Sequence, residues 1–316
     1  MDFTTGLRAV ANASGEEPVD WSAVATAAKA STDPGTLSLS ESEQAGYAAD
    51  VRDARSAISS LTGRSFAVPD TIEVQNRHHW IDANVETFRR VFEPLSREGV
   101  SIHRLTRTVN TATTAGTLAY VARHVLGQYD PLLLADGDPN HELYFVHPNV
   151  VRAAETLDVE YPRFRRWIAF HEVTHAAEFG AAPWLSEYLG DRLHEAIEEL
   201  SRYDVPRSSF AELNVAMTTV EGYAELLMDH AFDAESADLR EKLDARRRGG
   251  DPLSRVIRRL LGFTLKRQQY ERGRAFFDTV AGARGIDGVG VVWDRPENLP
   301  TEAELEQPKR WLDRMD

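Results

Sequence analysis

The 316-residue chain contains no cysteine. This absence excludes a disulfide framework, a thiolate zinc site, an iron–sulfur cluster and a cysteine nucleophile. Any metal must therefore be held by His, Asp and Glu side chains. The sequence also lacks a run of 18 apolar residues that could form a transmembrane helix, and its N-terminus lacks an apolar stretch of signal-peptide length. We therefore expect a cytoplasmic protein without a membrane partner.

Lysine is scarce: only four of the 36 basic residues are lysine, so 32 are arginine. With 50 acidic residues, the net charge is −14. A negative surface disfavours nucleic acid and anionic membranes as partners. Acidic excess keeps proteins soluble where salt screening is strong, so the composition predicts a halophilic protein. Replacement of lysine by arginine in a GC-rich genome is the alternative explanation.

Hydrophobic residues make up 42% of the chain, which is enough to bury a sizeable core. We expect one domain over residues 1–316. Within it, residues 1–19 should be loosely ordered, and residues 20–140 should form a helical N-terminal part. Residues 141–316 should form a second part.

The spacing of apolar residues and helix caps indicates a mainly α fold of the α+β class. Helices are expected over 21–31, 43–62, 80–98, 112–126, 161–203 (broken near Gly180 and Pro183), 208–232, 236–248, 252–261, 266–284 and 301–314. Short strands are expected around Ile72 and Val74, over 141–147 and over 288–293, whereas 127–140 has the composition of a loop.

One motif in the expected 161–203 helix carries chemistry. His171 and His175 are four residues apart, which places both imidazoles on one helix face about 6 Å apart. This spacing suits two ligands of one Zn²⁺ ion. Glu172 follows the first histidine, so its carboxylate can reach a metal-bound water without ligating the metal. The pattern is the HExxH motif of zinc metallopeptidases.

The third ligand is less directly specified. A metzincin would need Gly at 178 and His at 181, where this chain has Glu178 and Ala181. Seven residues separate Glu178 from His171, about 10 Å along the helix axis, so Glu178 is expected to support the ligands or face solvent. His194 and Glu195 are alternatives on the next helix. Glu221 is the better candidate, because it lies on a separate helix that Gly222 would allow another helix to approach.

These motifs resemble those of a family of zincin-like metallopeptidases. Members occur in actinobacteria, chloroflexi and haloarchaea and are often described as hydrolases or as coenzyme F420 biosynthesis-associated. The core of the resemblance is residues 164–190 and 221–229. Further matched segments are Val19–Trp21, Asn76–Trp80 with Ala83 and Asn84, Phe145–Asn149, Gly262–Tyr270, Gly273, Phe276 and Trp293–Pro300.

The resemblance implies a zincin-like core with the HExxH helix at its centre, lying in the 141–316 part. It implies His171, His175 and Glu221 as ligands of Zn²⁺ and Glu172 as catalytic base. Glu225 follows Glu221 on the same face and could orient the histidines. The resemblance places Gln at position 178, where this chain has Glu178.

We therefore expect a zinc hydrolase that cleaves an amide bond, most simply in a peptide or a small amide substrate. Tyr223, Tyr270 and His230 are candidate donors to the oxyanion, among which the sequence does not choose. Residues 142–147 are the expected edge strand for the substrate. The alternative is a metal-stabilised accessory or scaffold protein linked to coenzyme F420 metabolism, without peptidase turnover.

Overall fold

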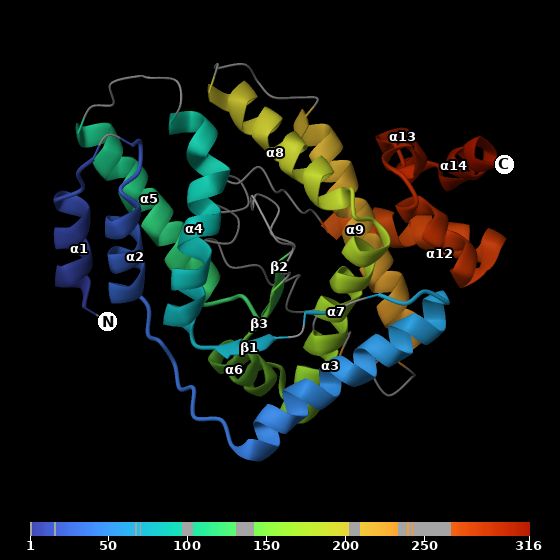
Figure 1. The fold of residues 1–316 in the computed structure, drawn as a ribbon, viewed down its shortest axis with the longest axis horizontal. Helices are drawn as coiled ribbons and strands as arrows, with labels where there is room; N and C mark the ends of the chain where they lie inside the picture. The colour runs from blue at the N-terminus through green and yellow to red at the C-terminus, as the bar shows by residue number, and fades with distance from the viewer. Residues whose placement is uncertain are drawn as a thin grey trace.

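The computed structural model describes residues 2–15, 17–66, 68–69, 71–96, 104–130, 142–201, 209–232, 239, 242 and 267–316. Helices dominate this part of the chain, and three short strands form a small sheet near its middle (Figure 1). The prediction of a mainly α fold of the α+β class is confirmed. Within the described residues, no helix is both long and apolar enough to cross a membrane.

The first part of the chain contains α1 (Phe3–Ala11), α2 (Trp21–Ala30), α3 (Glu41–Thr62), β1 (Ile72–Gln75), α4 (Arg77–Ser96), α5 (Arg104–Ala122) and β2 (Gly127–Asp130). The second part contains β3 (Glu142–Val146), α6 (His147–Leu157), α7 (Tyr161–Ala181), α8 (Leu185–Ser201), α9 (Ser209–Ala231), α12 (Arg267–Val289), the 3₁₀ helices η2 (Gly290–Trp293) and η3 (Pro296–Asn298), α13 (Glu302–Glu306) and α14 (Pro308–Met315).

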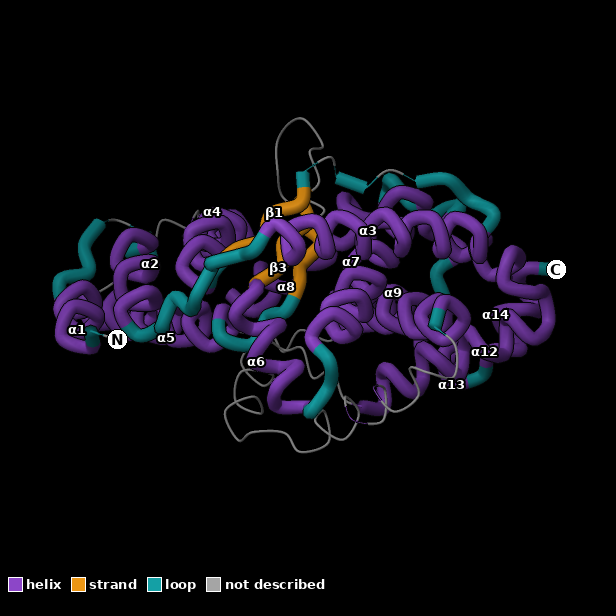
Figure 2. The backbone as a smooth tube through the Cα atoms, turned by 90° about the horizontal axis from the view of Figure 1, so that it is seen from below, coloured by secondary structure: helices purple, strands orange, loops and turns teal. Residues whose placement is uncertain are grey.

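The sheet has the order β1-β3-β2, with β1 parallel and β2 antiparallel to β3. Side chains of β3 alternate between two hydrophobic clusters, as the pleat requires. Leu143 and Phe145 join a large cluster with α3, α6, α7, α9 and α12, whereas Val146 joins a smaller cluster with α2, α4 and α5. Figures 1 and 2 show these two groups of helices at opposite ends of an elongated molecule, with the strands between them.

Local signals explain several helix ends. Ser40 and Glu43 form a capping box at the start of α3, and Gly63 ends this helix with a left-handed φ of 63°. Thr301 and Glu304 form the expected capping box of α13. The long expected block over 161–203 is broken between Ala181 and Leu185, which separates α7 from α8.

The loop expectation for residues 127–140 is wrong for 127–130, which form β2. Antiparallel pairing with β3 outweighs the loop-favouring composition, with Gly127 opposite Phe145 and Asp130 opposite Glu142. The remaining residues of that loop lie outside the described residues. Because β2 occupies one edge, β3 is the central strand of the described sheet. The expectation that 142–147 forms the edge strand is therefore wrong.

Other differences have similar causes. The strand expected over 288–293 is wrong, since Gly290–Trp293 forms η2; a short apolar run cannot distinguish a strand from a buried helical turn. The first 19 residues are not uniformly loose, because Phe3–Ala11 forms α1, which Asp2 caps, and Gly6 lies against Ala27 and Ala30 of α2. Helix α6 was not expected. The helices expected over 236–248 and 252–261 lie outside the described residues, except for 239 and 242.

Candidate metal centre

Helix α7 carries the HExxH motif through the interior of the larger cluster. Its apolar residues surround the motif on several faces, and Phe164, Phe170 and Val173 are all at most 1% exposed. Trp167 stacks on the His171 ring, with the ring centroids 5.8 Å apart and the planes nearly parallel. This packing fixes the orientation of the first histidine of the motif.

Helix α9 places Glu221 opposite the two histidines. The adjacent Gly222 lies against Gly273 of α12, where a Cβ on Gly222 would come within 2.6–2.8 Å of Gly273 backbone atoms. Only glycine permits so close a contact, because real Cβ atoms keep more distance from a neighbouring backbone. The expectation that Gly222 allows close approach of a second helix is therefore met by α12. This crossing fixes α9 against α12.

The side chains of His171, His175 and Glu221 converge on one point. One potential ligand atom from each lies within 4.8 Å of the other two. The two imidazole Nε2 atoms are 3.3 Å apart. Two atoms bound tetrahedrally to one zinc ion at ~2.1 Å would be about 3.4 Å apart, so the histidines already have the required spacing. Two imidazoles with one carboxylate fit Zn²⁺ better than Ca²⁺ or Mg²⁺, which prefer oxygen ligands.

Glu178 lies one turn after His175 on α7, and its Oε2 is 2.8 Å from His175 Nδ1. The Glu178 side chain is fully buried, and its other oxygen, Oε1, has no hydrogen-bond partner. A carboxylate on the far nitrogen of a metal-binding histidine fixes the tautomer and directs Nε2 toward the metal. Glu178 is therefore placed to orient His175.

Glu172 points to the sheet. Its Oε2 accepts a hydrogen bond of 2.9 Å from the backbone N–H of Tyr129 in β2. The residue is 7% exposed. Its carboxylate is absent from the group of three possible ligands, although it lies close enough to His175 to raise the pKa of that imidazole.

Three carboxylates, those of Glu172, Glu178 and Glu221, act on the charge of His175. Burial lowers the pKa of His175, but the carboxylates of Glu178, Glu221 and Glu172 together outweigh burial and raise it to about 10. Burial raises the pKa of Glu172 to about 7, with Glu221 adding to the rise and His175 and the Tyr129 N–H opposing it. Burial likewise raises the pKa of Glu178 to about 7. These carboxylates favour a cation between the imidazoles, either a proton or a metal ion.

The model of a zincin-like metallopeptidase family matches residues 19–207 and 199–312, which together span nearly the whole chain. The chain belongs to this zincin-like metallopeptidase family. A solved structure from Chloroflexus aurantiacus, described as a "putative hydrolase with a novel fold", is 29% identical to the chain. It covers 100% of this chain and 99% of its own, with a TM-score of 0.76. None of the curated proteins compared with the chain matches it.

Among the described residues of this zincin-like chain, the remaining candidates are not part of the group of three converging residues. Tyr223 is two residues from Glu221, so it leaves α9 about 200° around the helix. Its ring packs against Phe277 and Trp293. Burial raises the pKa of its hydroxyl, and the charge of Glu178 adds to the rise.

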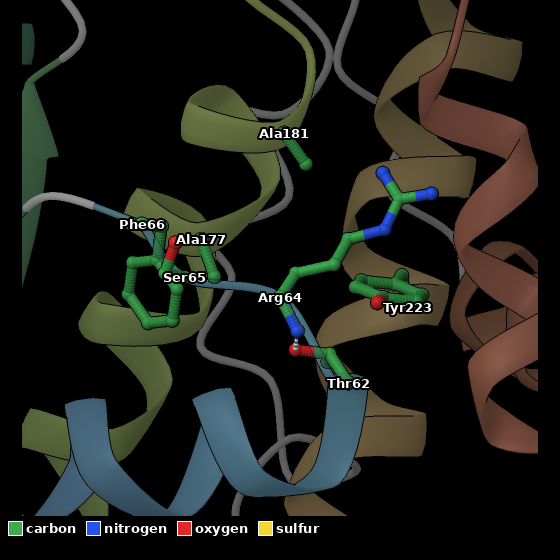
Figure 3. Close-up of a pocket in the computed structure, with 7 residues that line it drawn as sticks. All are labelled: Thr62, Arg64, Ser65, Phe66, Ala177, Ala181 and Tyr223. Atoms are coloured by element: carbon green, nitrogen blue, oxygen red, sulfur yellow. Dashed lines mark hydrogen bonds between the residues drawn. The ribbon is translucent and has the colours of Figure 1, made fainter.

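Tyr223 also lines a cavity of about 340 Å³ between α3, α7 and α9 (Figure 3). The other residues around this cavity are Thr62, Arg64, Ser65, Phe66, Ala177 and Ala181. In the view of Figure 3 the Arg64 side chain runs above the Tyr223 ring, and its guanidinium pairs with Asp294 at 3.0 Å. None of the three converging residues lines this cavity, and Tyr223 as oxyanion donor stays a prediction.

Glu225 lies half-buried one turn after Glu221 on α9. Tyr270 lies in α12, but its side chain is outside the described part. His194 and Glu195, the alternative ligands, lie on α8, where Glu195 pairs with Arg192 at 2.7 Å. Among the described residues, the group that could hold a metal contains Glu221 and neither of these two.

Sequence reasoning missed the contribution of β2. The N–H of Tyr129 and the small Gly127 both lie against Glu172. The signal in the sequence was weak, because a four-residue strand in a segment rich in Gly, Asp and Pro has no alternating apolar pattern long enough to identify it.

Proposed function

We propose that this protein is a zinc-dependent hydrolase that cleaves an amide bond, with a peptide as the simplest substrate. One observation carries the proposal. A carboxylate that is not among the converging ligands, Glu172, is buried and fixed by a backbone N–H beside the two imidazoles and the Glu221 carboxylate. A metal site that served only to stabilise the fold would not need this fourth group.

In this proposal, His171, His175 and Glu221 hold the ion, and Glu178 orients His175 through the hydrogen bond at Nδ1. Bound Zn²⁺ would supply a Lewis acid that lowers the pKa of a water molecule and polarises the substrate carbonyl. Three protein ligands leave a coordination position for this chemistry. The family match supports zinc as the metal.

Glu172 accepts the proton of the attacking water. One of its oxygens is occupied by the Tyr129 N–H, so the other, Oε1, is assigned to the water. Burial raises the pKa of Glu172 to about 7 in the absence of a cation, and a bound cation would lower it, so the carboxylate is ionised at neutral pH and can accept the proton. After transfer, the same carboxyl group can deliver the proton to the leaving amine.

The substrate would lie along β2. This strand forms the edge of the described sheet that packs against α7. A peptide added to a sheet edge is held by its backbone, which would bring a carbonyl alongside the HExxH helix. This assignment replaces residues 142–147, since β3 is central in the sheet.

The alternative is an accessory or scaffold protein, which would bind the metal but would not cleave an amide bond. Neither the family match nor the solved relative concerns coenzyme F420, so that association stays a prediction. Both functions require the metal, but only the hydrolase requires Glu172 to accept a proton.

The test compares the zinc-loaded parent with Glu172→Gln on a peptide library, with zinc content measured for both. We expect the parent to cleave a subset of peptides. The Glu172→Gln variant should keep one zinc ion per chain and lose on the order of 10²-fold or more in rate. Glu187→Gln, on the exposed surface of α8, is the matched control and should keep the parental rate. A Glu172→Gln variant as fast as the parent would refute the role of Glu172.

A further inference from the structure

Strand β2 presents successive residues to different parts of the molecule. Gly127 and Tyr129 lie against α7, where the Tyr129 ring packs on Phe179 with centroids 5.6 Å apart. Gln128, between them, lies against α4. This alternation is the normal period of a strand. The four-residue strand therefore connects the HExxH helix to the N-terminal group of helices.

Glu172 rests directly on the backbone of Gly127. A Cβ built on Gly127 would lie 2.6 Å from Glu172 Cγ, 2.9 Å from Cδ and 2.8 Å from Oε1. Gly127 does not have a positive φ, so its backbone conformation is open to other residues. Glycine is therefore needed at position 127 because a larger residue would occupy the space that the Glu172 side chain fills.

Gln128 prevents β2 from moving away. Its Oε1 accepts a hydrogen bond of 2.7 Å from Trp80 Nε1, and its Nε2 donates one of 3.0 Å to Asn84 Oδ1. Asn84 in turn donates to the Trp80 carbonyl oxygen at 3.0 Å. Trp80 and Asn84 are 2% and 3% exposed, so breaking this set would leave buried polar groups without partners. We call these three residues the Gln128 clamp.

We propose that Gly127 is a positioning residue for Glu172, and that the Gln128 clamp makes the position rigid. The inference rests on the proposed role of Glu172 as proton acceptor. With β2 held on α4 and Glu172 held by the Tyr129 N–H, a methyl group at position 127 cannot be accommodated by the strand. It must displace the Glu172 carboxylate, while His171, His175 and Glu221 keep their places.

The decisive variant is Gly127→Ala, compared with Gly116→Ala in α5. A Cβ on Gly116 would meet no atom within 4 Å, so the control makes the same chemical change without the clash. We expect Gly127→Ala to bind zinc within about twofold of the parent, because no ligand is moved. Its kcat should fall by about 10²-fold, toward that of Glu172→Gln. Gly116→Ala should match the parent in both.

A double variant separates positioning from general damage. If Gly127→Ala acts through Glu172, it should cause no further rate loss in the Glu172→Gln background. Equal losses in both backgrounds would overturn the proposal, as would a parental kcat for Gly127→Ala. Gln128→Met removes the clamp hydrogen bonds, so in that background Gly127→Ala should cost less. An undiminished loss there would overturn the part assigned to the clamp.

Amide hydrogen exchange provides a readout that does not depend on turnover. The Tyr129 N–H should exchange about tenfold faster or more in Gly127→Ala and in Glu172→Ala than in the parent and in Gly116→Ala. Unchanged exchange at Tyr129 would overturn the proposal even if no substrate is found. Faster exchange in a protein that hydrolyses no peptide would instead uphold the contact and refute the proposed function.

Discussion

Glu178→Gln offers a sensitive test of how the protein prepares His175 for metal binding. In the parent, a buried carboxylate oxygen lies 2.8 Å from His175 Nδ1. Gln keeps the shape and can still accept the hydrogen bond, but it removes the charge. Because Gln has nearly the same size and shape as Glu, the variant should fold.

The expected magnitude follows from the change in the hydrogen bond. A hydrogen bond to a charged group contributes about 1.5–3 kcal/mol and a neutral one about 0.5–1.5 kcal/mol, so the variant loses roughly 1–1.5 kcal/mol. That difference is about tenfold in zinc affinity, at the lower end of the range found when such supporting groups are removed. The new amide group replaces Oε1, which is buried without a partner. Its cost falls on the free and metal-bound states alike.

The assay is zinc competition against a chelating indicator at fixed pH, with Glu187→Gln as the control for charge removal at an exposed site. We expect a dissociation constant about tenfold higher for Glu178→Gln and parental for the control. A Glu178→Gln affinity equal to that of the parent would refute the argument that Glu178 orients and polarises His175.

Further predictions concern stability. Gly222→Ala must separate α9 from α12, because its methyl group would clash with Gly273 backbone atoms. The substitution should lower the free energy of unfolding by about 1–3 kcal/mol. Gly282→Ala is the control and should not lower it, because a Cβ there would meet no atom within 4 Å. Burial lowers the pKa of His147, so the unfolded state binds a proton at this imidazole more readily than the folded state does. The free energy of unfolding should therefore fall as pH drops below about 6.5, and it should fall less in His147→Gln. Urea unfolding at pH 5–8 measures both. Zinc held at the proposed site would stabilise the folded state, so verified chelation should lower the melting temperature; an unchanged value would mark the site as an incidental binder. Finally, screening of the −14 charge should raise the melting temperature between about 0.1 M and 2 M KCl; a flat or falling value would reject the halophilic prediction.

The parts of the site that depend on local spacing could be predicted from the sequence. The separation of His171 and His175 is fixed by helix geometry, so their convergence required only that the segment be helical. Glu221 was harder, because its place depends on the packing of α9. The adjacent Gly222 gave a physical reason for that packing, which the close approach of Gly273 in α12 fulfils.

The parts that depend on long-range pairing could not be predicted. Strand β2 exists because Gly127–Asp130 pairs with β3, and nothing within those four residues specifies the partner. The contacts of Glu172 with Tyr129 and Gly127 depend on that pairing and were missed with it. The same holds for Glu178. Its spacing from His171 was compatible either with supporting the ligands or with facing solvent, and only the packing of the helices shows that the side chain is fully buried.

The most direct test of the central claim is an anomalous diffraction measurement at the zinc absorption edge on crystals of the zinc-loaded protein. The proposal predicts one peak per chain, ~2.0–2.2 Å from the Nε2 atoms of His171 and His175 and from a carboxylate oxygen of Glu221. Absence of a peak between these residues, or a peak with Glu221 more than about 4 Å away, would contradict the assignment of the metal centre.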